Sequence, residues 1–299
     1  MSYRDLYCTK NTGFLNMNTP YAEAEFVVFG VPLDMTATYF PGARFGPESI
    51  RRASLNIETF DFESGFDVKK IKIIDIGDID VDYSSINETL VKISKVSSEI
   101  LSDSKKPLIL GGEHTLTLGA CRAFKKTVLI CFDAHLDLRE EYAGAKLSHA
   151  TFMRRLVEEE NVDRIIFVGT RAISSEESEF IRGKTNIRVI TAKEACKNGL
   201  EPTLKLIKNE INNYQNIYVS IDMDVFDPFL SPSVGNPEPG GLTYDLVSGV
   251  IESLEKNIIG ADVTEVAPIY NIDITSIYAA KLLFKIIKAM KNIKSRKRR

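Results

Sequence analysis

Short apolar runs rich in Val and Ile alternate along the chain with segments whose apolar positions follow a helical period. The run at 127–132 shows no polar alternation, which is typical of a strand buried on both faces. Residues 85–101 instead place an apolar side chain about every 3.6 positions, as one face of a helix does. A strand–helix rhythm of this kind predicts a three-layer α/β/α fold with a mostly parallel sheet of about eight strands.

The same pattern sets the expected bounds of the elements. The predicted strands are 26–31, 71–76, 107–110, 127–132, 164–169, 187–190, 217–221 and 258–263. The predicted helices are 48–53, 85–101, one that ends near 124, 148–160, 174–181, 201–212, 243–254 and 276–290. No linker, repeat or low-complexity block interrupts this order, so we predict one domain over residues 1–299.

Polar side chains that can bind metals follow two of the predicted strands. Asp133, His135 and Asp137 come directly after 127–132, and Asp222 and Asp224 follow 217–221. If the extended conformation persists, alternate residues point the same way, with about 6.5 to 7 Å between successive members. Buried acids at strand ends are costly unless cations neutralise them. Since sites in parallel sheets form at the carboxyl ends of strands, the two groups predict one metal site.

The chain has three histidines, and all of them lie near these strand ends. His114 follows a Gly-Gly turn, His135 lies within the first acidic group, and His149 begins a predicted helix. His114, His135 and the four aspartates would suffice for two metal ions if one or two carboxylates bridge them. This oxygen-rich set without thiolate favours Mn²⁺, with Zn²⁺, Co²⁺ and Fe²⁺ as alternatives.

Charge and composition narrow the class of partner. The net charge is −3, but the last fifteen residues carry eight Lys and Arg and no acid, which leaves −11 on residues 1–284. An acidic body favours cationic small molecules over nucleic acid, and we interpret the basic stretch 291–299 as a frayed terminus. The four cysteines are scattered, and no leader or membrane-spanning run is present, so we expect a cytoplasmic protein.

Four ordered motifs resemble those of the ureohydrolase (arginase/agmatinase) family over nearly the whole chain. They are Gly111-Gly112-Glu113-His114-Thr115, Asp133-Ala134-His135-Leu136-Asp137, the run from Ser220 to Pro228, and Glu265-Val266-Ala267-Pro268. The match is closest to agmatinase, through 30–34, 41–47, Ser148-His149 and 235–242. Glu113 and Thr115 stand where many members have Asp and Ser, which leaves the substrate preference open.

The resemblance implies a binuclear manganese centre that activates a shared water as hydroxide. The first ion would bind His114, Asp133, Asp137 and Asp222, and the second would bind Asp133, His135, Asp222 and Asp224. Glu265 would hold the substrate guanidinium, and His149 would shuttle a proton to the departing amine. Members commonly assemble as trimers or hexamers, so a homo-oligomer is expected.

The loop after Asp137 bears on the choice of substrate. Arginases typically hold the amino acid head with an Asn two residues beyond this last ligand, and here that position is Arg139. Glu140 or Glu141 would suit the distant ammonium of agmatine, whereas an inward Arg139 would suit a carboxylate. We predict hydrolysis of agmatine to putrescine and urea, with N1-aminopropylagmatine, guanidinobutyrate and arginine as alternative substrates.

Two hypotheses from other classes stay open at this point. A zinc hydrolase of the related deacetylase type would keep the fold but bind one zinc per chain. A metal-stabilised regulatory or nucleic-acid-binding protein would use the basic terminus and show salt-sensitive binding.

Overall fold

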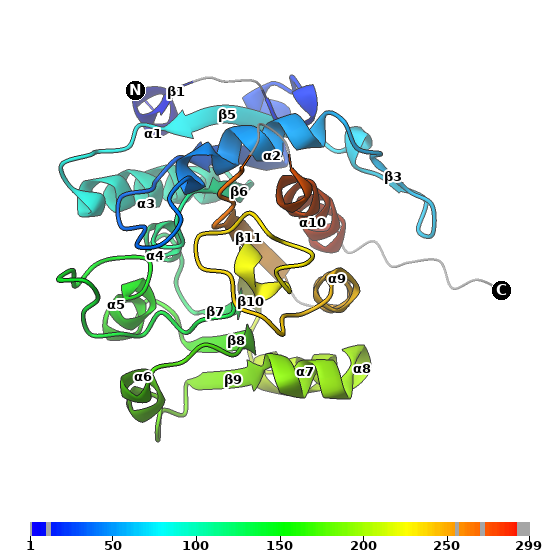
Figure 1. Ribbon diagram of the computed structural model, residues 1–299. Coiled ribbons are helices and arrows are strands. Elements are labelled where there is room, and N and C mark those ends of the chain that lie inside the picture. The colour runs from blue at the N-terminus through cyan, green and yellow to red at the C-terminus, as the bar shows by residue number, and fades with distance from the viewer. Residues whose placement is uncertain (1, 10–12, 255–256, 270–272, 292–299) are drawn as a thin grey trace.

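A nine-stranded sheet runs through the molecule, and helices cover both of its faces (Figure 1). The computed structural model describes residues 2–9, 13–254, 257–269 and 273–291. Every strand pair in this sheet is parallel except the pairing of β1 with β5. In sheet order the strands are β1 (Cys8–Thr9), β5 (Ile73–Ile79), β2 (Phe26–Val31), β6 (Lys106–Gly111), β11 (Asn257–Thr264), β10 (Asn216–Asp222), β7 (Thr127–Phe132), β8 (Arg164–Thr170) and β9 (Ile187–Thr191). The predicted fold class is therefore confirmed.

The strands are apolar because both faces of the sheet are covered. All six residues of β7 and all six of β2 are buried. One face packs on α2 (Gly46–Ser54), α7 (Ala192–Asn198), α8 (Leu200–Ile211), α9 (Tyr244–Glu252) and α10 (Ile274–Met290). The other packs on α3 (Ile86–Ser102), α4 (Leu116–Cys121) and α5 (Phe152–Glu158), with α6 (Ser175–Phe180) at its end and α1 (Tyr3–Tyr7) against α3.

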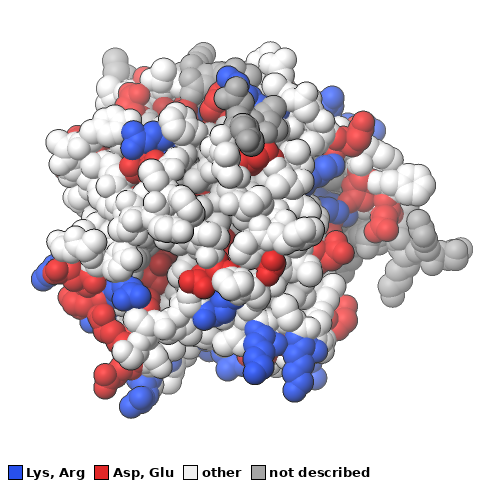
Figure 2. Space-filling view, in the orientation of Figure 1, with Lys and Arg blue, Asp and Glu red and all other residues white. Residues whose placement is uncertain are grey.

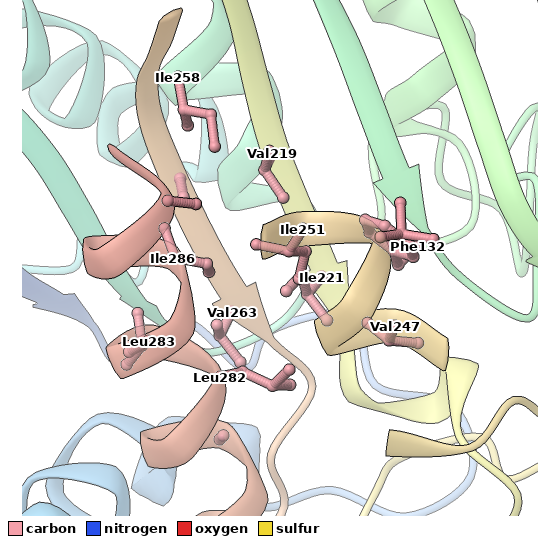
Figure 3. Packing of buried hydrophobic residues seen from close by; sticks show 14 of the residues in the cluster. Phe132, Val219, Ile221, Val247, Ile251, Ile258, Val263, Leu282, Leu283 and Ile286 are labelled. Carbon is pink, nitrogen blue, oxygen red and sulfur yellow. The ribbon is translucent and has the colours of Figure 1, made fainter. Parts of the chain in front are cut away.

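Side chains from strands and helices interdigitate in the first of these layers (Figure 3). Leu282 of α10 lies beside Val263 of β11, Leu283 follows it on the same helix, and Val247 and Ile251 of α9 lie over β10. Each of these five side chains is 0 or 1% exposed. Truncating a buried Leu or Ile to Ala typically costs about 2 to 5 kcal/mol, so this layer holds the central strands firmly in place.

A buried ion cluster joins α2 to β5. The Arg51 guanidinium is fully buried, and its Nε lies 2.7 Å from Asp75 Oδ2 while its Nη1 lies 2.6 Å from Asp78 Oδ1. Arg51 Nη2 also donates to the Gly77 carbonyl oxygen at 3.0 Å. Asp75 and Asp78 are therefore paired with a buried guanidinium, whereas no Lys or Arg among the described residues pairs with the acids at the ends of β7 and β10.

The structure corrects three expectations about local elements. The helix predicted to begin at 148 begins at Phe152, because Ser148 and Thr151 form a turn closed by the Thr151 N–H donating to the Ser148 carbonyl at 3.1 Å. The sheet has a ninth strand, the two-residue β1, and a small hairpin of β3 (Phe60–Asp61) and β4 (Phe66–Asp67) was not predicted. Of the basic stretch predicted at 291–299, residues 292–299 lie outside the described residues.

Among the residues that the structure describes, no helix is long and apolar enough to cross a bilayer.

Candidate active site

Four neighbouring strands at the centre of the sheet deliver the candidate site residues at their carboxyl ends. In sheet order, β6 leads to His114, β11 to Glu265, β10 to Asp222 and Asp224, and β7 to Asp133 and the residues after it. Figure 2 looks onto this edge and shows acidic side chains near the middle of the face, over the ends of β7 and β10. Residues far apart in sequence meet here because parallel strands end on one edge.

The segment after β7 reaches the site by turning rather than by continuing as a strand. β7 ends at Phe132, the His135 N–H donates to Asp133 Oδ1 at 2.6 Å, and Asp137 has a φ of +54°. The expected extended alternation is therefore wrong, although the residues it singled out do converge. A left-handed backbone at a non-glycine residue is costly, and here it turns the Asp137 carboxylate back toward His114.

The imidazole of His114 lies at the centre of three carboxylates. Its Nδ1 is 3.1 Å from Asp133 Oδ2, 3.1 Å from Asp222 Oδ2 and 3.5 Å from Asp137 Oδ2. Although buried, Nδ1 makes no hydrogen bond to any described residue. An unpaired ring nitrogen surrounded by carboxylate oxygens is suited to donate its lone pair to a cation.

A second group forms beside the first and shares Asp133 with it. His135 Nδ1 lies 2.9 Å from Asp224 Oδ2 and 3.6 Å from Asp133 Oδ1. The ligand atoms of Asp133, His135 and Asp224 lie close enough together to hold one metal ion. The two oxygens of Asp133 thus face different imidazoles, so this carboxylate is placed between two possible ion positions.

Electrostatics also favour cations at this place. Burial, reinforced by Asp224 and Asp133, raises the pKa of Asp222 well above its usual value. Burial and the charge of Asp133 raise the pKa of Asp137 to about 7. Asp222 and Asp137 are therefore reluctant to ionise beside the other acids, and divalent cations would remove that penalty. Cys131 lies nearby, with its Sγ 3.9 Å from His114 Nε2, but burial raises its thiol pKa and keeps it protonated.

A hydrogen-bonded chain behind His114 sets the orientation of its ring. His114 Nε2 lies 2.9 Å from Ser220 Oγ, and the Ser220 hydroxyl donates to Asp262 Oδ1 at 2.6 Å. The other Asp262 oxygen accepts from Tyr218 at 2.8 Å and from Thr117 at 3.0 Å. Because the Ser220 proton points to Asp262, its lone pair is left to accept from His114 Nε2–H, and a neutral ring of this tautomer presents the lone pair of its Nδ1 to the acids.

Glu265 lies at the floor of the same site in a constrained conformation. Its φ is +62°, its N–H donates to the Gly112 carbonyl at 2.9 Å, and its Oε1 accepts from the His114 N–H at 2.7 Å. Burial, with a further contribution from Glu113, raises its pKa to about 8. A buried acid of this kind is stabilised in its charged form by a cationic ligand.

The predicted proton shuttle lines the cavity, but it lies in a turn ahead of α5. Thr36 Oγ1 lies 3.1 Å from His149 Nδ1 and accepts from the His149 N–H at 3.0 Å. Glu113 holds this threonine, since its Oε1 accepts from the Thr36 hydroxyl at 2.9 Å and its Oε2 from the Thr36 N–H at 2.8 Å. Burial lowers the pKa of His149, so the imidazole is neutral at neutral pH. Glu113, one of the departures noted in the sequence, thus helps to position His149.

A cavity of about 590 Å³ opens over these groups. Arg139 lines it, with its guanidinium carbon 5.1 Å from the centre of the Tyr142 ring. Glu140 does not, because its carboxylate pairs with Arg154 at 2.6 Å on the outer surface over α5 and α6, where Figure 2 shows many acids. Glu141 is not among the lining residues either. The structure therefore brings one of the three predicted loop residues to the cavity, and it adds Glu238, which the sequence reasoning had not assigned a role.

The fold and the two carboxylate–imidazole groups describe a metal-binding α/β enzyme, and comparisons with known proteins identify its family. Residues 24–288 match the Arginase family model. An N(1)-aminopropylagmatine ureohydrolase from Thermococcus kodakarensis is 38% identical over 92% of this chain and 95% of its own length. An agmatinase from Pyrococcus horikoshii is 36% identical over 89% of this chain and 92% of its own. The crystal structure of agmatine ureohydrolase from Thermoplasma volcanium superposes with a TM-score of 0.85 at 33% identity, covering 95% of this chain and 96% of that one.

The chain belongs to the arginase family. It is an agmatinase-like amidinohydrolase that acts on a guanidino compound, and membership implies a binuclear metal site, for which His and Asp groups are present. The predicted family and the predicted enzymatic character are confirmed, which leaves the deacetylase-like and non-enzymatic hypotheses without support.

Proposed function

We propose that this protein hydrolyses agmatine to putrescine and urea with two Mn²⁺ ions per chain. The observation that carries the proposal is the pair of carboxylate–imidazole groups that share Asp133 on the floor of a cavity also lined by Glu265. Agmatine fits this arrangement as a cation with a planar guanidinium at one end and an ammonium at the other.

The donor set supports two ions that share ligands. His114, Asp133, Asp137 and Asp222 would hold the first ion, and Asp133, His135, Asp222 and Asp224 would hold the second. Four carboxylates balance two divalent charges, and hard oxygen ligands with two imidazoles suit Mn²⁺. When bound, two such metal ions lower the pKa of a water molecule and so supply hydroxide near neutral pH.

Glu265 and His149 perform the remaining steps that the reaction requires. The Glu265 carboxylate can accept two parallel N–H bonds from the guanidinium, which orients its carbon toward the acids. As the C–N bond to the alkyl chain breaks, the departing amine needs a proton. A neutral His149 at the cavity wall can relay one, taking it up from the solvent side and releasing it at the nitrogen.

The names of the relatives support more than one substrate. One relative is named for N(1)-aminopropylagmatine and another for agmatine, and both substrates carry a guanidinium on an amine-bearing chain. Guanidinobutyrate and arginine stay as alternatives because Arg139 lines the cavity. A trimer or hexamer stays a prediction from the family resemblance, and a cytoplasmic location stays a prediction from the sequence.

The test is urea release by Mn²⁺-loaded protein from agmatine, N1-aminopropylagmatine, guanidinobutyrate and arginine, compared as kcat/KM. We expect agmatine to give the highest value and Glu265→Gln to lower it by roughly 10²-fold or more. Glu23→Gln, which removes a charge from an exposed pair with Lys72, is the control and should leave activity unchanged. Absence of urea from every substrate would refute the proposed function, and a higher kcat/KM for arginine would refute the choice of agmatine.

A further inference from the structure

We propose that Glu238 is the specificity residue that binds the distal ammonium of the substrate. This inference rests on the proposed function and names the part of the cavity that selects an amine-ended guanidine. The sequence had pointed to Glu140 or Glu141 for this task, and neither lines the cavity.

Glu238 offers a carboxylate that no described residue occupies. It lines the same cavity as His135, Asp224 and Glu265, and no hydrogen bond or ion pair to its carboxylate is formed by any residue that the structure describes. The other glutamates of the lining are already engaged. Glu265 accepts from His114, and Glu177 accepts from the Leu138 N–H at 2.9 Å and from Ser174 at 2.7 Å. Glu238 is therefore the carboxylate in this wall that is left to meet a cation.

The backbone of Glu238 is held by Arg171. The Glu238 carbonyl accepts from Arg171 Nη2 at 2.7 Å, and the same nitrogen donates to the Asp224 carbonyl at 2.7 Å. One guanidinium thus joins the peptide of Glu238 to that of a candidate metal ligand. This connection fixes the backbone of Glu238 relative to that of Asp224, so substrates can be selected by the length of the chain between guanidinium and ammonium.

The neighbouring residues also restrict this segment. Glu238 lies between Pro237 and Pro239. The ring of Pro237 fixes the φ of that residue, and Pro239 restricts the backbone conformation of Glu238. It is also half-buried, where a carboxylate attracts an ammonium more strongly than it does in bulk water. A preformed acid in a restricted segment loses little entropy when it binds a ligand.

Two of the described cations line this cavity, and Arg171 is held by backbone carbonyls, which leaves Arg139 as the cation that a substrate could recruit. Among the described residues no carboxylate pairs with it, and its guanidinium lies over the Tyr142 ring, where cation–π attraction holds it. A carboxylate-ended substrate would have to draw Arg139 from the ring and would meet Glu238 as a like charge. An amine-ended substrate has neither difficulty, so the pair favours agmatine over guanidinobutyrate.

The test compares Glu238→Gln with the unmodified enzyme on three guanidines of similar length. Agmatine carries an ammonium, guanidinobutyrate a carboxylate, and n-pentylguanidine an uncharged methyl group. We expect the variant to raise KM for agmatine about tenfold with little change in kcat, to leave n-pentylguanidine unchanged, and to improve guanidinobutyrate. Glu238→Asp should recover part of the loss for agmatine.

Glu179→Gln removes the same charge from an exposed position on α6 and serves as the matched control, with no effect on any of the three substrates. An equal loss on all three guanidines in Glu238→Gln would show a merely structural role and overturn the inference, as would an unchanged KM for agmatine. If the unmodified enzyme releases no urea from any guanidine, the proposed function fails first and this inference fails with it.

Discussion

The chain from His114 through Ser220 to Asp262 gives a prediction that separates metal binding from catalysis. Ser220→Ala removes the hydroxyl that lies 2.9 Å from His114 Nε2 and donates to Asp262 at 2.6 Å. The imidazole then keeps Cys131 Sγ, at 3.9 Å, as its only other close contact on that side among the described residues. A ring without its acceptor can rotate or change tautomer, and Nδ1 would no longer be held toward the acids.

The expected magnitude follows from what Ser220→Ala leaves unpaired. Asp262 keeps Tyr218 and Thr117 as donors to its Oδ2, so the buried atoms that lose Ser220 as a partner are His114 Nε2 and Asp262 Oδ1. A buried donor without an acceptor costs about 1 to 3 kcal/mol. Loss of a partner behind a metal-binding His weakens metal affinity roughly 10- to 100-fold, or about 1.4 to 2.7 kcal/mol. The two figures are of similar size, so the loss of metal affinity should be large enough to measure.

The assay is calorimetric titration of metal-stripped protein with Mn²⁺. We expect one of two binding steps to weaken in Ser220→Ala and the other, assigned to the group around His135, to stay within a few-fold. Ser97→Ala is the matched control, because Ser97 is fully buried in α3 and its hydroxyl has no hydrogen-bond partner among the described residues. It removes the same atom and should leave both steps unchanged.

Two outcomes would refute this reasoning. Unchanged Mn²⁺ affinity in a folded Ser220→Ala protein would show that the hydroxyl does not orient His114. Equal weakening in Ser97→Ala would show a general effect of core truncation.

Three further predictions follow from other parts of the structure. Removing metal with a chelator should lower the melting temperature, and Mn²⁺ should restore it. At a hundredfold excess over Kd, bound Mn²⁺ should add about 2.7 kcal/mol to the free energy of unfolding. An unchanged melting temperature would contradict metal binding at this site. Thr36→Val, which deletes the contact to His149, should lower kcat roughly tenfold with little change in KM, and a loss confined to KM would argue against positioning of a proton carrier. Burial alone would raise the pKa of Asp61, but hydrogen bonds from Lys285, Ser64 and Lys288 outweigh it and lower that pKa. The ionised Asp61 carboxylate therefore stabilises the fold at neutral pH, and this stabilisation is lost as the pH falls. Asp61→Asn should lower the free energy of unfolding by on the order of 1 kcal/mol at pH 7 and by progressively less below about pH 4, as measured by urea unfolding.

The central strands could be predicted because burial on both faces leaves a direct mark on the sequence. The expected strand 127–132 coincides with β7, and the expected helix 85–101 differs from α3 by one residue at each end. β1 has no such mark, since two residues cannot show a period. It forms because Cys8 and Thr9 find Ile79 and Asp78 across the sheet edge, a tertiary contact about seventy positions away.

The candidate site was predicted at the level of residue types rather than of geometry. Asp133, His135 and Asp137 were chosen by alternation, yet they converge through a turn. Asp262 carries no local signal, because a single acid within an apolar strand acquires its meaning only when Ser220 and Tyr218 of the neighbouring strand are placed beside it. The choice between Glu140 and Glu238 likewise depends on Arg154, which neutralises the first and does not reach the cavity.

The two strained residues of the site show how far the protein backbone arranges it. Asp137 and Glu265 both adopt positive φ, at a cost of about 1 to 2 kcal/mol each for a residue with a side chain. The strained backbone of Glu265 is maintained by the hydrogen bond from its N–H to the Gly112 carbonyl and by the β-bridge between Val234 and Val266, and neither contact involves a ligand. A conformation maintained by such backbone contacts does not depend on bound metal. The β6–β11 pairing sets the strand geometry that positions Glu265. Metal removal should therefore lower the stability of the protein while leaving Glu265, the residue that would hold the guanidinium, in place.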